Sequence, residues 1–277
     1  MNRKSIVFIH GIGPQDHGYS DISWKLLWQG ENPEDARKYE LFYYDIFEDM
    51  NKKLEVDKFV QNYGLEKIIN GIMGNQSFSD NINKILSDTV SHVLYFLLVP
   101  DVYNVIVRLF VNKLNNVLLE AVNEGFPPQR HDIVIISHSL GTVVAYCGLH
   151  HAMAELGTGI QANVRIKTLF SLATPLELIK TVGEKIKIKI QHVSDGIDKP
   201  KEWDPAKGIY IKYLKKWYSY RHKFDPVASL IPLKGAFLDS ADDSPFVFGQ
   251  LPGKDVHDYS NYIKQSRDII LGQIMED

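Results

Sequence analysis

The sequence contains one cysteine and no long apolar run, and each of these shortages excludes a class of protein. A single cysteine, Cys147, cannot form an intramolecular disulfide, so a disulfide-stapled scaffold is excluded. The apolar run Val93–Val99 is far shorter than the ~18 to 20 residues that a membrane-spanning helix needs. The run Ile6–Ile9 is too short for a signal-peptide core, and no cleavage site follows it. We therefore expect a cytoplasmic protein.

The sequence also lacks an excess of basic residues. It has 31 lysines and arginines against 34 acidic residues, a net charge of −3, so no electropositive surface indicates a nucleic-acid partner. The composition, with 44% hydrophobic and 23% charged residues, is ordinary for a globular protein, and we detect no repeat. A length of 277 residues suits one α/β domain with an insertion, and we expect residues 1–277 to form a single domain.

The most informative stretch is Asp132–Leu149, which consists of an apolar run, a turn of small residues and a second apolar run. The β-branched run Ile133–Ile136 predicts a strand that is buried on both faces. The residues Gly141–Leu149 predict a packed helix rich in small side chains. Between them, Ser137–Gly141 must reverse the chain within a few residues.

Ser139 occupies the middle of this turn. A reversal this sharp predicts a strained backbone at the middle residue and leaves room only for tiny side chains two positions away, where Ser137 and Gly141 stand. We expect the Ser139 hydroxyl to be exposed above the end of the strand, over the positive end of the following helix. A serine presented in this way is a candidate nucleophile.

This strand, turn and helix resemble the nucleophile elbow of the α/β-hydrolase family, whose pattern is G-x-S-x-G. The chain departs from the pattern at Ser137, which stands in place of the first glycine. The resemblance implies an α/β-hydrolase fold, with a mostly parallel central sheet and helices on both faces. It also implies that Ser139 is the catalytic nucleophile.

A serine nucleophile needs a histidine base and a carboxylate that orients the histidine. In the family, the acid and then the histidine follow the serine along the chain. The turn at Asp225, which precedes a proline, resembles the acid loop, and Asp195 is the alternative acid. Only His257 lies downstream of Asp225, so chain order selects it as the base. Asp255 and Asp258 are local alternatives as partners of the imidazole.

A glycine-rich turn follows the strand predicted at Ser5–Ile9. In the resemblance, this turn is the oxyanion loop, and the implied hydrogen-bond donors are the backbone N–H groups of Ile12 or Gly11 and of Leu140. His10 precedes the serine and therefore fits a role in shaping the loop better than the role of base.

Two other kinds of site are not supported. Pro14 follows Gly13 where a dinucleotide-binding fingerprint needs a helix and a third glycine. The histidines His10, His17 and His138 lack a companion carboxylate or cysteine at ligand spacing, so we expect neither a metal site nor a cofactor.

The remaining pattern predicts further strands and an insertion. We expect a helix at Ser20–Trp28 and strands at Glu40–Ile46 and Val164–Ala173. We expect residues 48–123 to form an insertion with three helices, near 56–72, 82–97 and 102–122. The first two are candidates for a cap over the site and the third for the crossover helix. The alternative is that all three are ordinary core helices.

These features predict a serine hydrolase that acts on a carboxylic ester, either a small molecule or a lipid. Thioesters and amides are alternative substrates for the same three residues. A non-catalytic binding protein on this fold is the alternative from another class, because a fold does not fix a function. A further alternative is that the apolar helices of the insertion form a lid that contacts a membrane surface.

Overall fold

A computed structural model describes most of the predicted core of the chain. The described residues are 2–11, 17–31, 33–54, 89, 91–127, 130–156, 165–176, 214–220, 225, 227–228 and 257–276.

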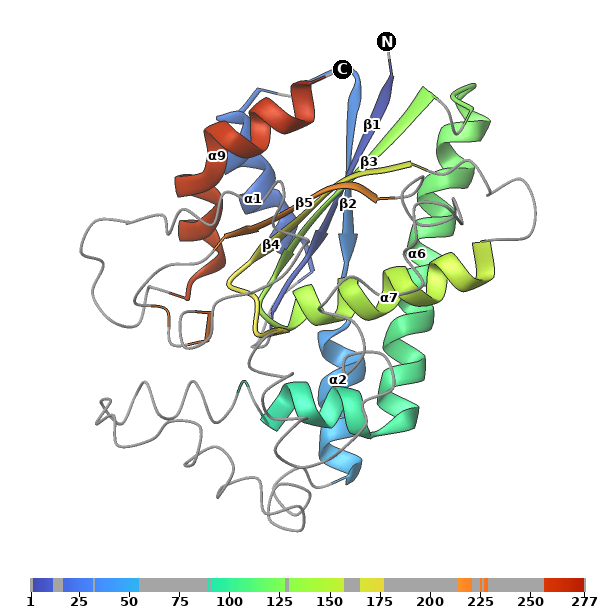
Figure 1. Ribbon diagram of the computed structural model, residues 1–277, viewed down its shortest axis with the longest axis vertical. Helices are drawn as coiled ribbons and strands as arrows, with labels where there is room; N and C mark the ends of the chain where they lie inside the picture. The colour runs from blue at the N-terminus through green and yellow to red at the C-terminus, as the bar shows by residue number, and fades with distance from the viewer. Residues whose placement is uncertain are drawn as a thin grey trace.

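The described strands form one five-stranded sheet in which every pair of neighbours is parallel (Figure 1). The strands are β1 (Arg3–Ile9), β2 (Ala36–Leu41), β3 (His131–His138), β4 (Arg165–Leu172) and β5 (Leu214–Tyr220), and their order is β2-β1-β3-β4-β5. The central strand β3 is buried along its whole length, as its β-branched sequence predicts. The chain is therefore an α/β protein with a parallel sheet.

Helices cover both faces of the sheet. The side chains of each strand alternate between the two faces, and apolar side chains on both faces form two cores that the helices bury. The described helices are α1 (Tyr19–Trp28), α2 (Tyr44–Leu54), α6 (Pro100–Asn123), α7 (Leu140–Leu156), α9 (Tyr259–Met275) and the segment Ser91–Leu98. In β3, Ile133 and Ile135 point toward the core that α6 and α7 share. Val134 and Ile136 point toward the core shared by α1 and α9.

The strand order changes direction at β1, with β2 on one side and β3 on the other. The chain leaves β1 through α1 to β2 and returns through α6 to β3. At such a switch point, the loops after the two central strands diverge and leave space at the carboxyl edge of the sheet, where open α/β sheets bind their ligands. The residues that follow Ile9 and Ser137, which are partners across the sheet, therefore meet there.

The predicted strand at Glu40–Ile46 is wrong in its boundaries. The strand β2 ends at Leu41, and the helix α2 begins at Tyr44. The aromatic residues in this stretch favoured a strand, but Tyr43 and Phe47 are four residues apart, joined by a backbone hydrogen bond of 3.1 Å, and both are buried. Their burial on one side of a helical turn outweighs their preference for strands.

The insertion predicted at 48–123 is described in part. Its third helix is confirmed as α6, whose apolar stripe packs against α7 in the core, and Pro100 stands at the first turn of the helix. The segment Ser91–Leu98 meets α6 at a bend of 88°. The helix predicted near 56–72 lies outside the described residues. In the described part of the chain, no single helix has the length and apolarity to cross a membrane, although this bent pair passes the same test jointly.

Candidate active site

Ser139 occupies the sharp turn between β3 and α7, and its backbone has the predicted strain. Its φ is 51°, in the left-handed region that costs a residue with a side chain roughly 1–2 kcal/mol. The turn is fixed by a hydrogen bond of 2.9 Å from the Ser139 N–H to the carbonyl of Leu172, the last residue of β4. Because the surrounding structure enforces this conformation, the position of the hydroxyl is set by the fold.

The predicted exposure of Ser139 is wrong, because only 2% of the residue is accessible. Gly11 packs directly against it, since a Cβ on Gly11 would lie 2.7 Å from the Ser139 Cβ. His257 contacts the hydroxyl from another side. The nucleophile candidate is therefore enclosed by its own site and does not project freely into solvent.

The two small residues around Ser139 have different reasons to be small. A Cβ on Gly141 would lie 2.2 Å from the carbonyl oxygen of His10, so only glycine lets α7 approach the end of β1 this closely. Ser137, at the position of the first family glycine, is fully buried, and its Oγ donates a hydrogen bond of 2.9 Å to the carbonyl of Phe170. The hydroxyl is satisfied by β4, which explains how the site accommodates the departure from the pattern.

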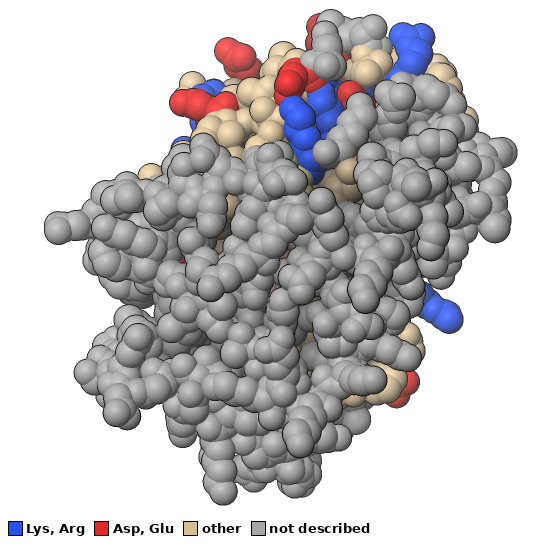
Figure 2. All heavy atoms as spheres, in the orientation of Figure 1, with Lys and Arg blue, Asp and Glu red and all other residues tan. Residues whose placement is uncertain are grey.

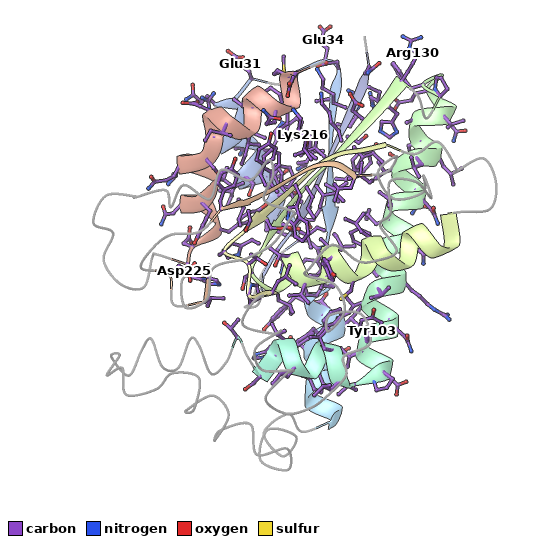
Figure 3. The ribbon with its side chains drawn as sticks, viewed as in Figure 1. Glu31, Glu34, Tyr103, Arg130, Lys216 and Asp225 are labelled. Atoms are coloured by element: carbon purple, nitrogen blue, oxygen red, sulfur yellow. The ribbon has the colours of Figure 1, made fainter. Side chains whose placement is uncertain are left out.

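The structure brings Ser139, His257 and Asp225 together in a continuous relay. The Nε2 of His257 lies 2.9 Å from the Ser139 Oγ, and its Nδ1 lies 2.8 Å from the Oδ2 of Asp225. Ser139 lies in the β3–α7 turn, Asp225 in the segment after β5 and His257 in the segment before α9. Asp225 is labelled in Figure 3. In the tautomer with the proton on Nδ1, the Nδ1–H donates a hydrogen bond to the carboxylate. The Nε2 is then free to accept the hydroxyl proton of Ser139.

Asp225 is completely buried and is held by several donors. Its Oδ1 accepts hydrogen bonds from the backbone N–H groups of Val227 at 2.8 Å and Ala228 at 3.3 Å. Its Oδ2 accepts from His257 and also from the hydroxyl of Tyr262 at 2.6 Å. Burial alone would raise the pKa of Asp225, but the charge of His257 and these donors outweigh it and lower the pKa below its ordinary value. Asp225 is therefore ionised at neutral pH.

Of the alternative acids, only Asp258 is described, and it has another role. The side chain of Asp258 accepts a hydrogen bond of 3.1 Å from the N–H of Asn261 and so caps α9. Asp195 and Asp255 lie outside the described residues.

The described oxyanion candidates are adjacent to Ser139. Gly11 packs against the serine, and Leu140 is the first residue of α7, where backbone N–H groups have no partner within the helix. The positive end of the helix dipole also lies there. Ile12 lies outside the described residues, so its predicted role stays a prediction.

Two buried histidines line the site without joining the relay. The ring of His10 stacks on Tyr43 at a centroid distance of 4.3 Å, and burial lowers the pKa of His10 to about 4. The ring of His138 lies 4.8 Å from that of His257, and burial holds the pKa of His138 well below its ordinary value. Both are neutral at physiological pH, and His10 shapes the end of β1, where its carbonyl accepts a hydrogen bond of 2.8 Å from Tyr43.

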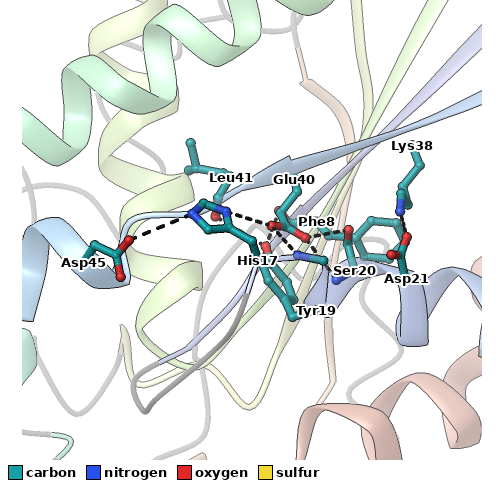
Figure 4. Close-up of polar contacts among 10 residues, drawn as sticks. Phe8, His17, Tyr19, Ser20, Asp21, Lys38, Glu40, Leu41 and Asp45 are labelled. Carbon is teal, nitrogen blue, oxygen red and sulfur yellow. Dashed lines mark hydrogen bonds and ion pairs between the residues drawn. The ribbon is translucent and has the colours of Figure 1, made fainter.

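The start of α1 is anchored to the neighbouring strands (Figure 4). The two carboxylate oxygens of Glu40 accept hydrogen bonds from the N–H of Gly18 at 3.0 Å and from the hydroxyl of Ser20 at 2.7 Å. The hydroxyl of Tyr19 donates to the carbonyl of Phe8 at 2.7 Å. Among the described residues, no group of three or more histidine, cysteine or acidic side chains is arranged to hold a metal ion.

Sequence reasoning did not identify Tyr262 or His138 as parts of the site. The contact of Tyr262 with Asp225 spans 37 residues, so no local pattern indicates it.

Comparisons of the chain with protein-family models, curated proteins and solved structures find no match.

Proposed function

We propose that the chain is a serine hydrolase of the α/β-hydrolase type that cleaves carboxylic esters. The observation that carries the proposal is the relay from Ser139 through His257 to Asp225, with distances of 2.9 and 2.8 Å. Support also comes from the left-handed conformation of Ser139 at the end of the central strand, which is the geometry of a nucleophile elbow.

In the proposed first step, the Ser139 Oγ attacks the ester carbonyl carbon while its proton passes to the Nε2 of His257. Asp225 fixes the tautomer of His257 and stabilises the imidazolium that forms. The developing oxyanion accepts hydrogen bonds from backbone N–H groups, for which Leu140 and Gly11 or Ile12 are the candidates. When the tetrahedral intermediate collapses, His257 returns the proton to the departing alcohol, which leaves an acyl group on Ser139.

The second half of the cycle uses the same groups. Water attacks the acyl carbonyl and gives its proton to His257, a second tetrahedral intermediate forms, and its collapse releases the carboxylic acid and restores the Ser139 hydroxyl. The sum is one ester and one water converted to one alcohol and one acid. An alcohol is a better leaving group than an amine, so this relay is better suited to esters than to amides.

A serine-directed organophosphorus probe tests the proposal. Because Ser139 is only 2% accessible, a small probe such as diisopropyl fluorophosphate should be used beside a bulkier fluorophosphonate. We expect one covalent adduct, located on Ser139 and not on Ser137 by peptide mapping.

Matched variants distinguish a serine that His257 activates from a serine that is merely accessible to the probe. We expect labelling to be lost in His257→Ala and kept in His17→Ala, because His17 is 74% exposed and takes no part in the relay. Folded protein that neither probe labels would contradict the proposal and favour a non-catalytic binding protein.

A further inference from the structure

Tyr262 and His257 share one oxygen of Asp225. The hydroxyl of Tyr262 donates to the Oδ2 at 2.6 Å, and the Nδ1 of His257 lies 2.8 Å from the same atom. Tyr262 is 1% exposed, so water does not replace this donor. A hydrogen bond from a hydroxyl to a carboxylate at this distance is of the strong, charge-assisted kind.

Both donors lie at the start of α9. His257 lies just before α9 and Tyr262 lies in its first turn, so the docking of α9 sets both contacts together. The docking is firm, because Ile263 and Ile270 are fully buried and the Nε of Arg267 donates to a carbonyl of α1 at 2.9 Å. The position of the Tyr262 hydroxyl is therefore fixed by packing well away from the relay.

We infer that Tyr262 is a positioning residue that acts on His257 through Asp225 and sets how strongly the carboxylate holds the imidazolium. This inference rests on the proposed function, because a base is needed only if Ser139 reacts. Two backbone N–H groups hold the other oxygen of Asp225, so the carboxylate keeps its orientation without Tyr262. The contribution of Tyr262 is consequently electronic: its donor draws charge from the oxygen that faces His257.

The direction of the effect follows because Tyr262 and His257 share one oxygen of Asp225. With the hydroxyl removed, the negative charge of Asp225 is compensated by one donor fewer and attracts the imidazolium more strongly. His257 then keeps its proton to higher pH and is unavailable as a base over a wider range. Of the described titratable groups that face the relay, His138 stays neutral because its pKa is well below the ordinary value, and Tyr259 stays neutral because burial raises its pKa.

The test is the rate of organophosphorus labelling of Ser139 between pH 5 and 9 in wild type and Tyr262→Phe. We expect the acid limb of the profile to move up by about half a pH unit, so that labelling at pH 6 slows about threefold while the alkaline plateau is kept. The matched control is Ser266→Ala. It removes a buried hydroxyl of the same helix, which donates to the backbone carbonyl of Tyr262 at 2.6 Å. Its profile should coincide with that of wild type.

A second substitution should shift the acid limb in the opposite direction while keeping a hydroxyl at position 262. Site-specific 3-fluorotyrosine at position 262 is a stronger donor, so the acid limb should move to lower pH. A third measurement needs no reaction: the downfield proton resonance of the His257–Asp225 hydrogen bond should move in Tyr262→Phe and stay in place in Ser266→Ala.

The possible results separate the two proposals. If wild type is labelled but neither the acid limb nor the resonance responds to either change at Tyr262, the inference is overturned. A lowered plateau with an unmoved limb overturns it too, since that is the result of damaged packing. If wild type is never labelled and the resonance still moves, the coupling through Asp225 stands and the proposed function fails.

Discussion

The two ends of the parallel sheet both bury polar side chains, but they do so in different ways. At the amino end, charged groups are matched in local pairs, and Figure 2 shows charges of both signs gathered there. The pairs are Lys4 with Asp35 at 3.1 Å, Arg3 with Glu124 at 2.8 Å and Lys167 with Asp132 at 3.7 Å. Each of these cations therefore lies beside a carboxylate of opposite charge, so the charges at this end are matched locally.

At the carboxyl end, the polar groups form a chain instead of pairs, and the backbone is strained. Ser139 and Ala173, which follow neighbouring strands, have φ values of 51° and 53°. The relay ends on the neutral hydroxyl of Ser139. A directed relay and two strained residues lower stability if they have no use, so their meeting at this end supports the proposed site. The third described non-glycine residue with a positive φ, Gln29, ends α1 and lies apart from the relay. We therefore expect substitutions at the carboxyl end to change reactivity and substitutions at the amino end to change stability.

The largest effect is expected from replacing Ser139 by alanine or by glycine. Both variants should lose organophosphorus labelling and ester turnover by at least ~10⁴-fold, because the nucleophile is gone. Glycine also relieves the left-handed backbone, so the free energy of unfolding of Ser139→Gly should exceed that of Ser139→Ala by about 1 kcal/mol. Urea denaturation measures this difference. Equal stabilities would contradict the claim that Ser139 is strained, and residual labelling would contradict its role.

An intermediate effect, on stability alone, is expected from Lys167→Met at the amino end. The Lys167 and Asp132 side chains are 8% and 5% exposed, so removing the lysine leaves a buried carboxylate without its cation. Breaking such a pair costs about 3 kcal/mol, which urea denaturation detects. The labelling rate of Ser139 in the folded variant should equal that of wild type. A slower rate would contradict the separation of the two ends.

The carboxyl-end site was largely predictable from the sequence because its local signals agree. The run Ile133–Ile136 indicated a buried strand, the small residues around Ser139 required a sharp turn, and chain order left one histidine after Asp225. The structure then places these residues within hydrogen-bond distance. Periodicity and turn chemistry are local, so they can be read from one sequence.

What the sequence did not indicate depends on contacts between distant segments. Tyr262 has the spacing of a core residue of α9, and only the docking of the helix shows that its hydroxyl reaches Asp225. The end of β2 was misplaced because the burial of Phe47 beside Tyr43 is a property of the tertiary core. The low accessibility of Ser139 likewise arises from the approach of Gly11, which follows β1.

The smallest effect is expected at Glu40, which lies at the carboxyl end but has a stabilising contact typical of the amino end. It caps α1 from β2, and Glu40→Gln keeps one acceptor but loses the charge, which should lower the free energy of unfolding by about 1 kcal/mol at pH 7. Burial opposes ionisation of Glu40, but the hydrogen bonds from Gly18 and Ser20 lower its pKa below the ordinary value.

The sign of the pH dependence follows from this shift. A carboxyl group with a lowered folded-state pKa contributes its stability above the unfolded-state value and loses it as the pH falls through the folded-state value. The stability difference between wild type and Glu40→Gln should therefore be full at pH 7 and shrink below about pH 4, as denaturation at several pH values can show. Glu34→Gln, an exposed substitution in the turn before β2, should show no such pH-dependent difference. Because Tyr19 also anchors this segment, labelling of Ser139 should be unchanged in Glu40→Gln, and a slower rate would assign Glu40 to the reactive end of the sheet.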